Sequence, residues 1–186
     1  MRRTFFSIAM TIATASAYSV NAAELSGTID SQITLVDGCA IFGAPAGPVT
    51  GANFGMLQFG ARASAFTGSV TAQVTGGAGG SGTTQIICSP DVAGLTISVD
   101  GGQNAGQGST VGVGTRAMAF SGSYLPYEVY RDLGMTTAYP IGTAQSIATP
   151  SSGPVPLPIY GRVNKTATGA LQAGTYTDRL VVTLTW

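Results

Sequence analysis

The residue types that carry out most enzyme chemistry are scarce in this chain of 186 residues. It contains no His, the commonest general base and the commonest metal ligand in proteins. Its eight acidic residues are scattered, and its only lysine, Lys165, lies in a turn-like Asn-Lys-Thr stretch that lacks the S-x-x-K pattern of serine–lysine enzymes. We therefore expect no catalytic residue, no metal site and no enzymatic activity.

Two glycine-rich stretches, residues 76–82 and 101–114, could be considered for ligand binding. The first is not followed by Gly-Lys-Ser/Thr and does not open a helix, as a phosphate-binding loop requires. The second begins Gly-Gly-Gln-Asn and lacks the acidic spacing of calcium-binding repeats. Both are typical of loops between strands, and we expect no cofactor.

The charge balance excludes one class of partner. Only 9% of the residues are charged, with eight basic and eight acidic side chains. Proteins that bind nucleic acid use a surplus of basic side chains to contact the phosphates. We expect no nucleic acid partner. The hydrophobic fraction of 44% still allows the chain to collapse into a globular domain.

Four tyrosines, Tyr124, Tyr127, Tyr130 and Tyr139, form the densest aromatic group. Tyrosine is a favourable strand residue, so packing in the core and on sheet faces is the simpler interpretation. A platform on which a ligand stacks is the alternative, because binding surfaces also favour Tyr.

The N-terminus has the pattern of a secretory signal peptide. A basic start, Met1-Arg2-Arg3, precedes an apolar run over residues 5–17, and small side chains surround Ala22. We predict a signal peptide over residues 1–22. No later apolar run approaches the roughly 20 residues that cross a bilayer, so we expect an exported protein without a membrane span.

The predicted export bears on whether the two cysteines form a disulfide. Cys39 and Cys88 are the only pair in the chain, and they would reach an oxidising compartment. An even number of cysteines without His favours a disulfide over a metal site. We predict a disulfide between Cys39 and Cys88.

Alternation of apolar and polar residues recurs along the chain and predicts an all-β fold. Apolar residues of single runs share a face at positions 70, 72 and 74, at 86 and 88, at 95, 97 and 99, and at 125, 127 and 129. A further run over residues 155–163 contains prolines, which indicate an edge or irregular strand. Many short strands with glycine-rich connections are typical of a β-sandwich.

The first residues after the signal peptide alternate without interruption. The residues of one phase are Leu25, Gly27, Ile29, Ser31, Ile33 and Leu35. The segment could be an ordinary first strand, paired within its own sheet. Alternatively it pairs with another molecule, because an edge strand with alternate apolar side chains is what strand addition requires.

The C-terminus also ends within a predicted strand, over residues 176–186. The residues of its apolar phase are Leu180, Val182, Leu184 and Trp186. Since no polar tail follows them, both ends of the mature chain are predicted to be structural elements.

The order of several motifs resembles that of the spore coat protein U domain. These motifs are Asp37-Gly38-Cys39, the stretch 53–60, Ile87-Cys88, the strand 95–102 ending in Asp-Gly-Gly, Leu125-Pro-Tyr-Glu-Val-Tyr-Arg-Asp132, the stretch 155–161 and the stretch 173–184. The resemblance covers nearly the whole mature chain. Such domains occur in subunits of archaic chaperone–usher pili.

The resemblance implies an incomplete immunoglobulin-like β-sandwich that is completed by donor-strand exchange. A periplasmic chaperone first lends a strand, and at the outer-membrane usher the N-terminal extension of the next subunit replaces it. Residues 23–36 would be this donor extension and residues 37–186 the pilin domain, with residues 180–186 edging the acceptor groove and contacting the chaperone.

The implied function is that of a structural subunit of an adhesive, extracellular pilus that supports attachment and biofilm formation. Its partners would be the chaperone, the usher and identical or related subunits joined head to tail. Two alternatives stay open: a secreted spore or cell-surface coat protein, and a carbohydrate-binding sandwich that uses the tyrosines.

Overall fold

The structure is a computed structural model, and it describes residues 25–35, 37–44, 51–149 and 153–186. The predicted signal peptide lies outside these residues. The chain divides into two units, residues 1–34 and Leu35–Trp186. No helix of the described part is long and apolar enough to cross a membrane.

The unit Leu35–Trp186 is all-β, as predicted. Within the described residues its single helix is a 3-10 turn at Gly77–Gly79. Its strands are β1 (Cys39–Ile41), β2 (Met56–Leu57), β3 (Gly68–Thr75), β4 (Gln85–Cys88), β5 (Leu95–Val99), β6 (Gly112–Val113), β7 (Arg116–Phe120), β8 (Ser123–Tyr130), β9 (Gln145–Ile147), β10 (Val155–Pro156), β11 (Tyr160–Lys165) and β12 (Val182–Thr185).

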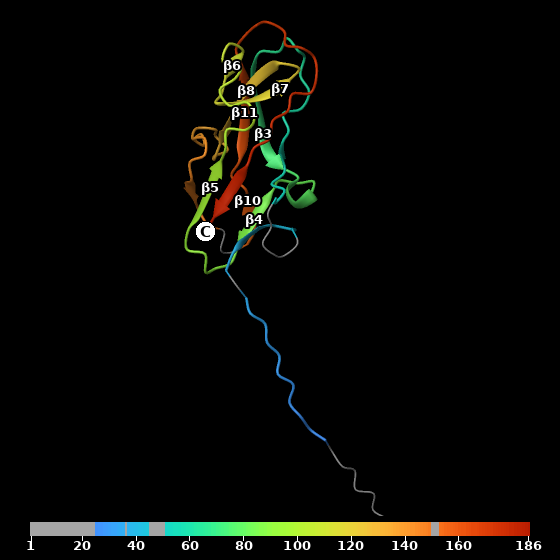
Figure 1. The fold of residues 1–186 in the computed structure, drawn as a ribbon, viewed down its shortest axis with the longest axis vertical. Coiled ribbons are helices and arrows are strands. Elements are labelled where there is room, and N and C mark those ends of the chain that lie inside the picture. Colours follow the sequence, from blue (N-terminus) through green and yellow to red (C-terminus); the bar gives the residue numbers. More distant parts are fainter. Residues whose placement is uncertain (1–24, 36, 45–50, 150–152) are drawn as a thin grey trace, which may run out of the picture. The chain divides into compact units, whose positions relative to one another are not determined.

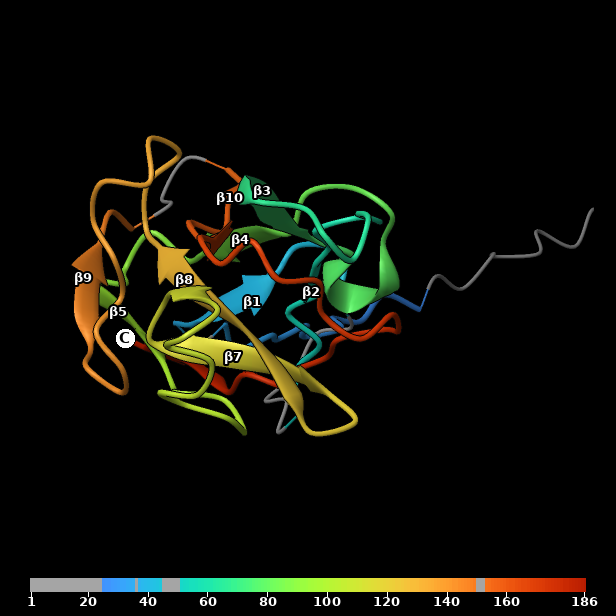
Figure 2. The ribbon, with the colours of Figure 1, turned by 90° about the horizontal axis from the view of Figure 1, so that it is seen from above.

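The strands form three antiparallel sheets. The largest has the order β2-β3-β11-β8-β7, with β6 also paired to β11. The two smaller sheets are β1-β4-β10 and β12-β5-β9. Figure 1 shows β3, β11 and β8 as neighbours, and Figure 2 shows β5 beside β9.

One hydrophobic core unites the three sheets. Its fully buried side chains include Ile86 of β4, Ile97 of β5, Val129 of β8 and Val163 of β11. The apolar residues that predicted these strands are the buried ones in the fold, and most of the residues between them are more exposed, because successive side chains of a strand point to opposite faces. The predicted all-β sandwich is therefore confirmed.

The proline-containing run divides into two strands with different environments. β10 holds Pro156 and pairs only with β4, at the edge of its sheet, where a missing N–H is tolerated. β11 begins after the last proline and lies between β3 and β8. The prediction of an edge or irregular strand is thus right for β10 and wrong for β11.

Lys165 is not in a turn, as its neighbours predicted, but is the last residue of β11 and is fully buried. Its Nζ donates hydrogen bonds to the carbonyl oxygens of Ala167 and, at 2.8 Å, Gly169. The ammonium also lies 5.8 Å from the centre of the Phe66 ring. These contacts hold the loop after β11 against the strand, so Lys165 has a structural role.

Candidate functional site

An apolar groove of about 780 Å³ lies in the described part of the chain. One wall is β1, and the other is the C-terminal segment 176–186, which includes β12. The apolar side chains between the walls belong to Phe54, Leu57, Phe59, Val74, Met118 and Ile159. The groove therefore lies between the first and the last strand of the sandwich.

The backbone of β12 offers unpaired hydrogen-bonding groups to this groove. β12 is an edge strand that pairs with β5, and the backbone N–H of Asp100 donates to the carbonyl of Val181 at 3.0 Å. Along an antiparallel pair, the residues that bond to the partner alternate with residues that point away from it. The N–H and C=O groups of Val182 and Leu184 therefore point away from β5. In the described part of the chain, no strand pairs with this edge.

The same argument applies to β1, which is the edge strand next to β4. The N–H of Phe42 donates to the carbonyl of Gln85 at 2.8 Å, and the N–H of Ser89 donates to the carbonyl of Gly38 at 2.9 Å. The backbone groups of Cys39 and Ile41 consequently point away from β4. The groove thus has a free strand edge on each of its two walls.

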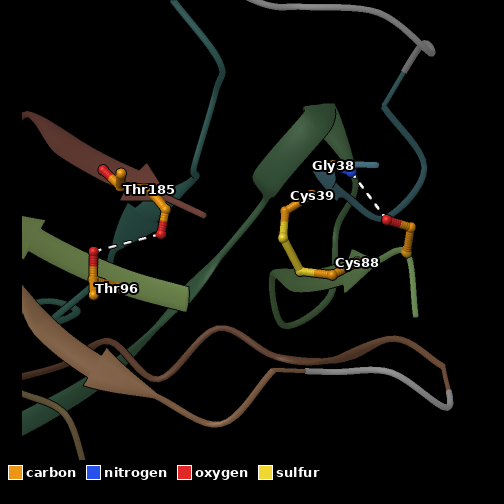
Figure 3. The surroundings of a disulfide bond; sticks show 6 residues. Gly38, Cys39, Cys88, Thr96 and Thr185 are labelled. Carbon is orange, nitrogen blue, oxygen red and sulfur yellow. Dashed lines mark hydrogen bonds between the residues drawn. A yellow bond between two sulfur atoms is a disulfide. The ribbon is translucent and has the colours of Figure 1, made fainter. Parts of the chain in front are cut away.

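The predicted disulfide is confirmed: Cys39 and Cys88 are bonded, and they lie directly opposite one another in the pairing of β1 with β4. The N–H of Gly38 also donates to the hydroxyl of Ser89 at 3.0 Å. Figure 3 shows this region together with the β5–β12 pair, where the Thr96 hydroxyl donates to the carbonyl of Thr185. The disulfide therefore fixes β1, a strand of three residues, as a wall of the groove.

Removal of this disulfide is expected to destabilise the domain. Replacing both Cys39 and Cys88 by Ser should cost about 2–4 kcal/mol, because the bond closes a loop with a sequence separation of 49 residues. Thermal unfolding of the variant, compared with the oxidised parent protein, measures the effect. An unchanged midpoint would show that pairing with β4 alone holds β1.

Trp186 lines one end of the groove, where its indole packs over Gly38. A Cβ atom added at Gly38 would lie 3.7 Å from the ring, so the indole lies close to this glycine. The side chain remains 53% exposed. An incoming strand could therefore bury a large apolar surface at this end of the groove.

The C-terminal segment changes sheets as it forms its wall. Thr177 pairs with Ala119 of β7, whereas residues 182–185 pair with β5. This corrects the prediction of one continuous strand over residues 176–186. The carboxylate of Asp178 fixes the change of partner, because its oxygens accept hydrogen bonds from the Gln103 and Arg179 N–H groups and from the Tyr127 hydroxyl, each at 2.8 Å.

Two further residues support this crossing. Oδ1 of Asp100 accepts hydrogen bonds from the N–H of Val181 at 2.9 Å and of Gly102 at 3.0 Å. Gly102 has a φ of 68°, and a Cβ atom there would lie 2.1 Å from Oδ2 of Asp178. Glycine is therefore required for the backbone to approach the Asp178 carboxylate.

Arg116 is a structural centre that the sequence patterns did not predict. It is fully buried at the start of β7, and it forms an ion pair of 2.7 Å with Glu128 of β8. Its guanidinium also donates to the backbone carbonyls of Asp100, Val99 and Tyr139 at 2.7, 3.1 and 3.2 Å. The signal that could have predicted this centre was the presence of two charged residues, Arg116 and Glu128, inside strands of a chain with few charges.

The tyrosine group serves the core, which is the simpler of its two interpretations. Tyr127, Tyr130 and Tyr139 are buried, and Tyr124 is half-buried. The Tyr139 hydroxyl donates to the carbonyl of Pro158 at 3.0 Å, and burial raises the pKa of Tyr139 to about 12. Burial, and then the hydrogen bond to Asp178, raise the pKa of Tyr127. The buried rings of Tyr130 and Tyr139 therefore offer no stacking platform to a ligand from solvent.

The predicted donor segment, residues 25–35, forms no helix or strand. Of its alternating apolar side chains, Leu25 is 100% exposed and Ile29 is 97% exposed, and Ile33 and Leu35 are exposed as well. The segment thus presents apolar side chains and backbone groups to solvent. The C-terminal residues Leu180, Val182, Leu184 and Trp186, by comparison, all line the groove.

No group of three or more acidic or cysteine side chains among the described residues could hold a metal ion. One carboxylate with a perturbed pKa, Asp132, accepts hydrogen bonds from the backbone N–H groups of Thr136 at 3.0 Å and Thr137 at 2.7 Å. These bonds lower its pKa, the bond from Thr136 having the larger effect. They close the turn after β8, so Asp132 has a structural role.

No curated protein matches the chain. Among solved structures, it is similar to a chain in the crystal structure of the CsuC–CsuE chaperone–tip adhesion subunit pre-assembly complex, from the archaic chaperone–usher Csu pili of Acinetobacter baumannii. The two are 21% identical with a TM-score of 0.45, and the match covers 82% of this chain and 40% of that one.

The model of the Spore Coat Protein U domain family matches residues 25–183, which is most of the sequence. The match includes every motif on which the resemblance was based, except Leu184 at the end of the stretch 173–184. The expectation drawn from these motifs is confirmed, and the chain belongs to the spore coat protein U domain family.

Proposed function

We propose that the protein is a structural subunit of an extracellular adhesive pilus, assembled by donor-strand complementation. The observation that carries this proposal is the apolar groove between the free edges of β1 and β12. Exposed edges and apolar side chains are a liability in a free monomer, because both favour aggregation. A strand from another molecule, inserted into the groove, would pair with both edges and bury the apolar lining.

The N-terminal segment supplies a strand of the required kind. Its six alternating positions, residues 25–35, carry apolar side chains at four positions and small ones at two. Burial of the four large side chains would contribute roughly 6–12 kcal/mol as an upper bound, before any ladder hydrogen bonds. We assign residues 23–36 as the donor extension and residues 37–186 as the acceptor domain.

Assembly would follow the route that the family resemblance implies. After removal of residues 1–22 in the periplasm, a chaperone would occupy the groove, and at the outer-membrane usher the extension of another subunit would replace it. Each subunit then donates to one neighbour and accepts from another, and such a head-to-tail interface builds an open fibre. The confirmed disulfide is compatible with this oxidising route. The role is structural rather than enzymatic.

The proposal predicts fibres that resist detergent. The purified assembly should run as a ladder of oligomers in unheated SDS and collapse to monomer after boiling, since each inserted strand must be withdrawn from a closed groove. Gel electrophoresis of heated and unheated samples is the measurement. Monomer alone under both conditions, from cells that export the protein, would refute it.

A chaperone requirement separates a pilus subunit from a coat protein that assembles without an usher. A pilus subunit should accumulate in the periplasm only when the chaperone is co-expressed, because the groove is otherwise uncovered. A coat protein should be stable without it. Equal yields with and without the chaperone would favour the coat protein.

A further inference from the structure

The C-terminal wall presents a regular row of side chains to the groove. Residues 176–184 and Trp186 line the groove, and burial alternates along them: residues 176, 178, 180, 182 and 184 are half-buried, and the residues between them are exposed. Four of them also pack against the core, namely Tyr176, Leu180, Val182 and Leu184. The row matches in length and period the row of six alternating positions in residues 25–35.

One position of the wall row differs in chemistry from the others. Asp178 lines the groove with its hydrogen-bonded partner Tyr127, so a carboxylate and a phenol interrupt the apolar surface. An apolar side chain laid over this pair would remove water from the carboxylate without replacing the lost hydrogen bonds. A small hydroxyl side chain would replace them.

The donor row also has one position of different chemistry. Ser31 is its only hydroxyl residue, and the other five positions are apolar residues or glycine. A serine hydroxyl can donate a hydrogen bond to a carboxylate oxygen. Matching the single polar position of each row aligns Ser31 with Asp178.

The direction of the donor follows from coverage of β12. If the donor runs antiparallel to the wall, this alignment places Ile29 opposite Leu180 and Leu25 opposite Leu184. The donor then covers β12. If it runs parallel, Ile33 meets Leu180 and no donor residue of the row reaches Leu184. Antiparallel pairing covers more of the free edge and forms the more stable ladder.

We propose that the extension of a second copy lies antiparallel to β12 with Ser31 opposite Asp178. This inference rests on the proposed function. Gly27 then lies opposite Val182, and Ile33 opposite Tyr176. In this register the backbone groups of Val182 and Leu184 that point away from β5 face donor residues of the inward phase, as a ladder requires.

A pair of cysteine substitutions measures this register directly in polymers of the full chain. Leu25→Cys with Leu184→Cys should cross-link neighbouring subunits, so the ladder should survive boiling without reductant and collapse when reductant is added. The matched control, Ile29→Cys with Leu184→Cys, puts the two positions four residues out of register, beyond the Cα separation of about 7 Å that a disulfide spans. Cross-linking of the control pair but not of the first pair would overturn the register.

Substitution of Ser31 tests the polar contact separately. Ser31→Leu should make the ladder dissociate in SDS at least about tenfold faster, since the carboxylate would lose water without gaining the serine hydroxyl as a further donor, whereas Ser31→Thr retains the hydroxyl and should change the rate little. A ladder of Ser31→Leu that is equally or more stable would mean that Ser31 faces an apolar pocket, and would overturn the inference. A parent protein that forms no ladder would instead contradict the proposed function.

Discussion

The variant Ile29→Asp is expected to fold and to bind its chaperone but to form no SDS-resistant ladder. Ile29 is 97% exposed, and residues 25–35 form no strand in the described structure, so its replacement should not disturb the folded domain. In a polymer the same position would enter an apolar groove, where an unpaired carboxylate costs several kcal/mol. Loss of the ladder from exported, chaperone-bound protein is the result to measure.

The neighbouring variant Thr28→Asp is the matched control. It adds the same charge one residue away, in the opposite phase of the alternating segment. Its side chain would point out of the groove, because successive side chains of a strand point to opposite faces. The ladder should persist in this variant. If Ile29→Asp fails to fold while Thr28→Asp folds, residues 25–35 form an internal strand and the donor assignment is wrong.

Replacement of Arg116 by Met should be the most damaging single change within the domain. The substitution leaves the Glu128 carboxylate without its ion pair and removes the donor to the carbonyls of Val99, Asp100 and Tyr139. Breaking a buried ion pair by removing one partner costs about 3–5 kcal/mol. This is a large fraction of the roughly 5–15 kcal/mol that stabilises a typical domain. Urea unfolding followed by circular dichroism, with each variant made in the Ile29→Asp background and purified as its chaperone complex, gives the difference in free energy of unfolding.

Arg62→Met provides the comparison, since Arg62 is exposed and its side chain donates to the carbonyl of the adjacent Ala61. The free energy of unfolding of this variant should lie within about 0.5 kcal/mol of that of the parent protein, as is usual for surface substitutions. Equal effects of the two variants would show that the Arg116 contacts add nothing to the free energy of unfolding.

The strands that carry the core could be predicted from the sequence because burial enforces their alternation. In β5 the apolar residues Leu95, Ile97 and Val99 are buried, and the residues between them are Thr96 and Ser98. The predictions of β4 and β8 have the same physical basis. Where one face of a strand is buried, the period of two is visible in the residues themselves.

The strands that were not predicted are those with little alternation to detect. β1, β2, β6 and β9 have two or three residues each, too few for a period of two to stand out. β7 begins with Arg116, a residue that normally indicates exposure. Its burial depends on Glu128 and on three backbone carbonyls from distant segments, and no local pattern encodes those contacts.

The groove itself could be predicted only in outline. The family resemblance implied that the C-terminal strand edges it, but the change of sheets at Asp178 depends on tertiary contacts with Tyr127 and Gln103. These contacts join residues that are 51 and 75 positions apart. Alternation over residues 176–186 therefore predicts one strand, although two sheets share the segment.

The free edge of β12 also determines how a joint between subunits would bear a pulling force. In an antiparallel ladder the hydrogen bonds lie perpendicular to the strands. Tension along a fibre linked through inserted strands would pull each strand lengthwise, in shear, so that its bonds resist together rather than opening one after another. The joint would then yield at a higher force than a ladder peeled from one end.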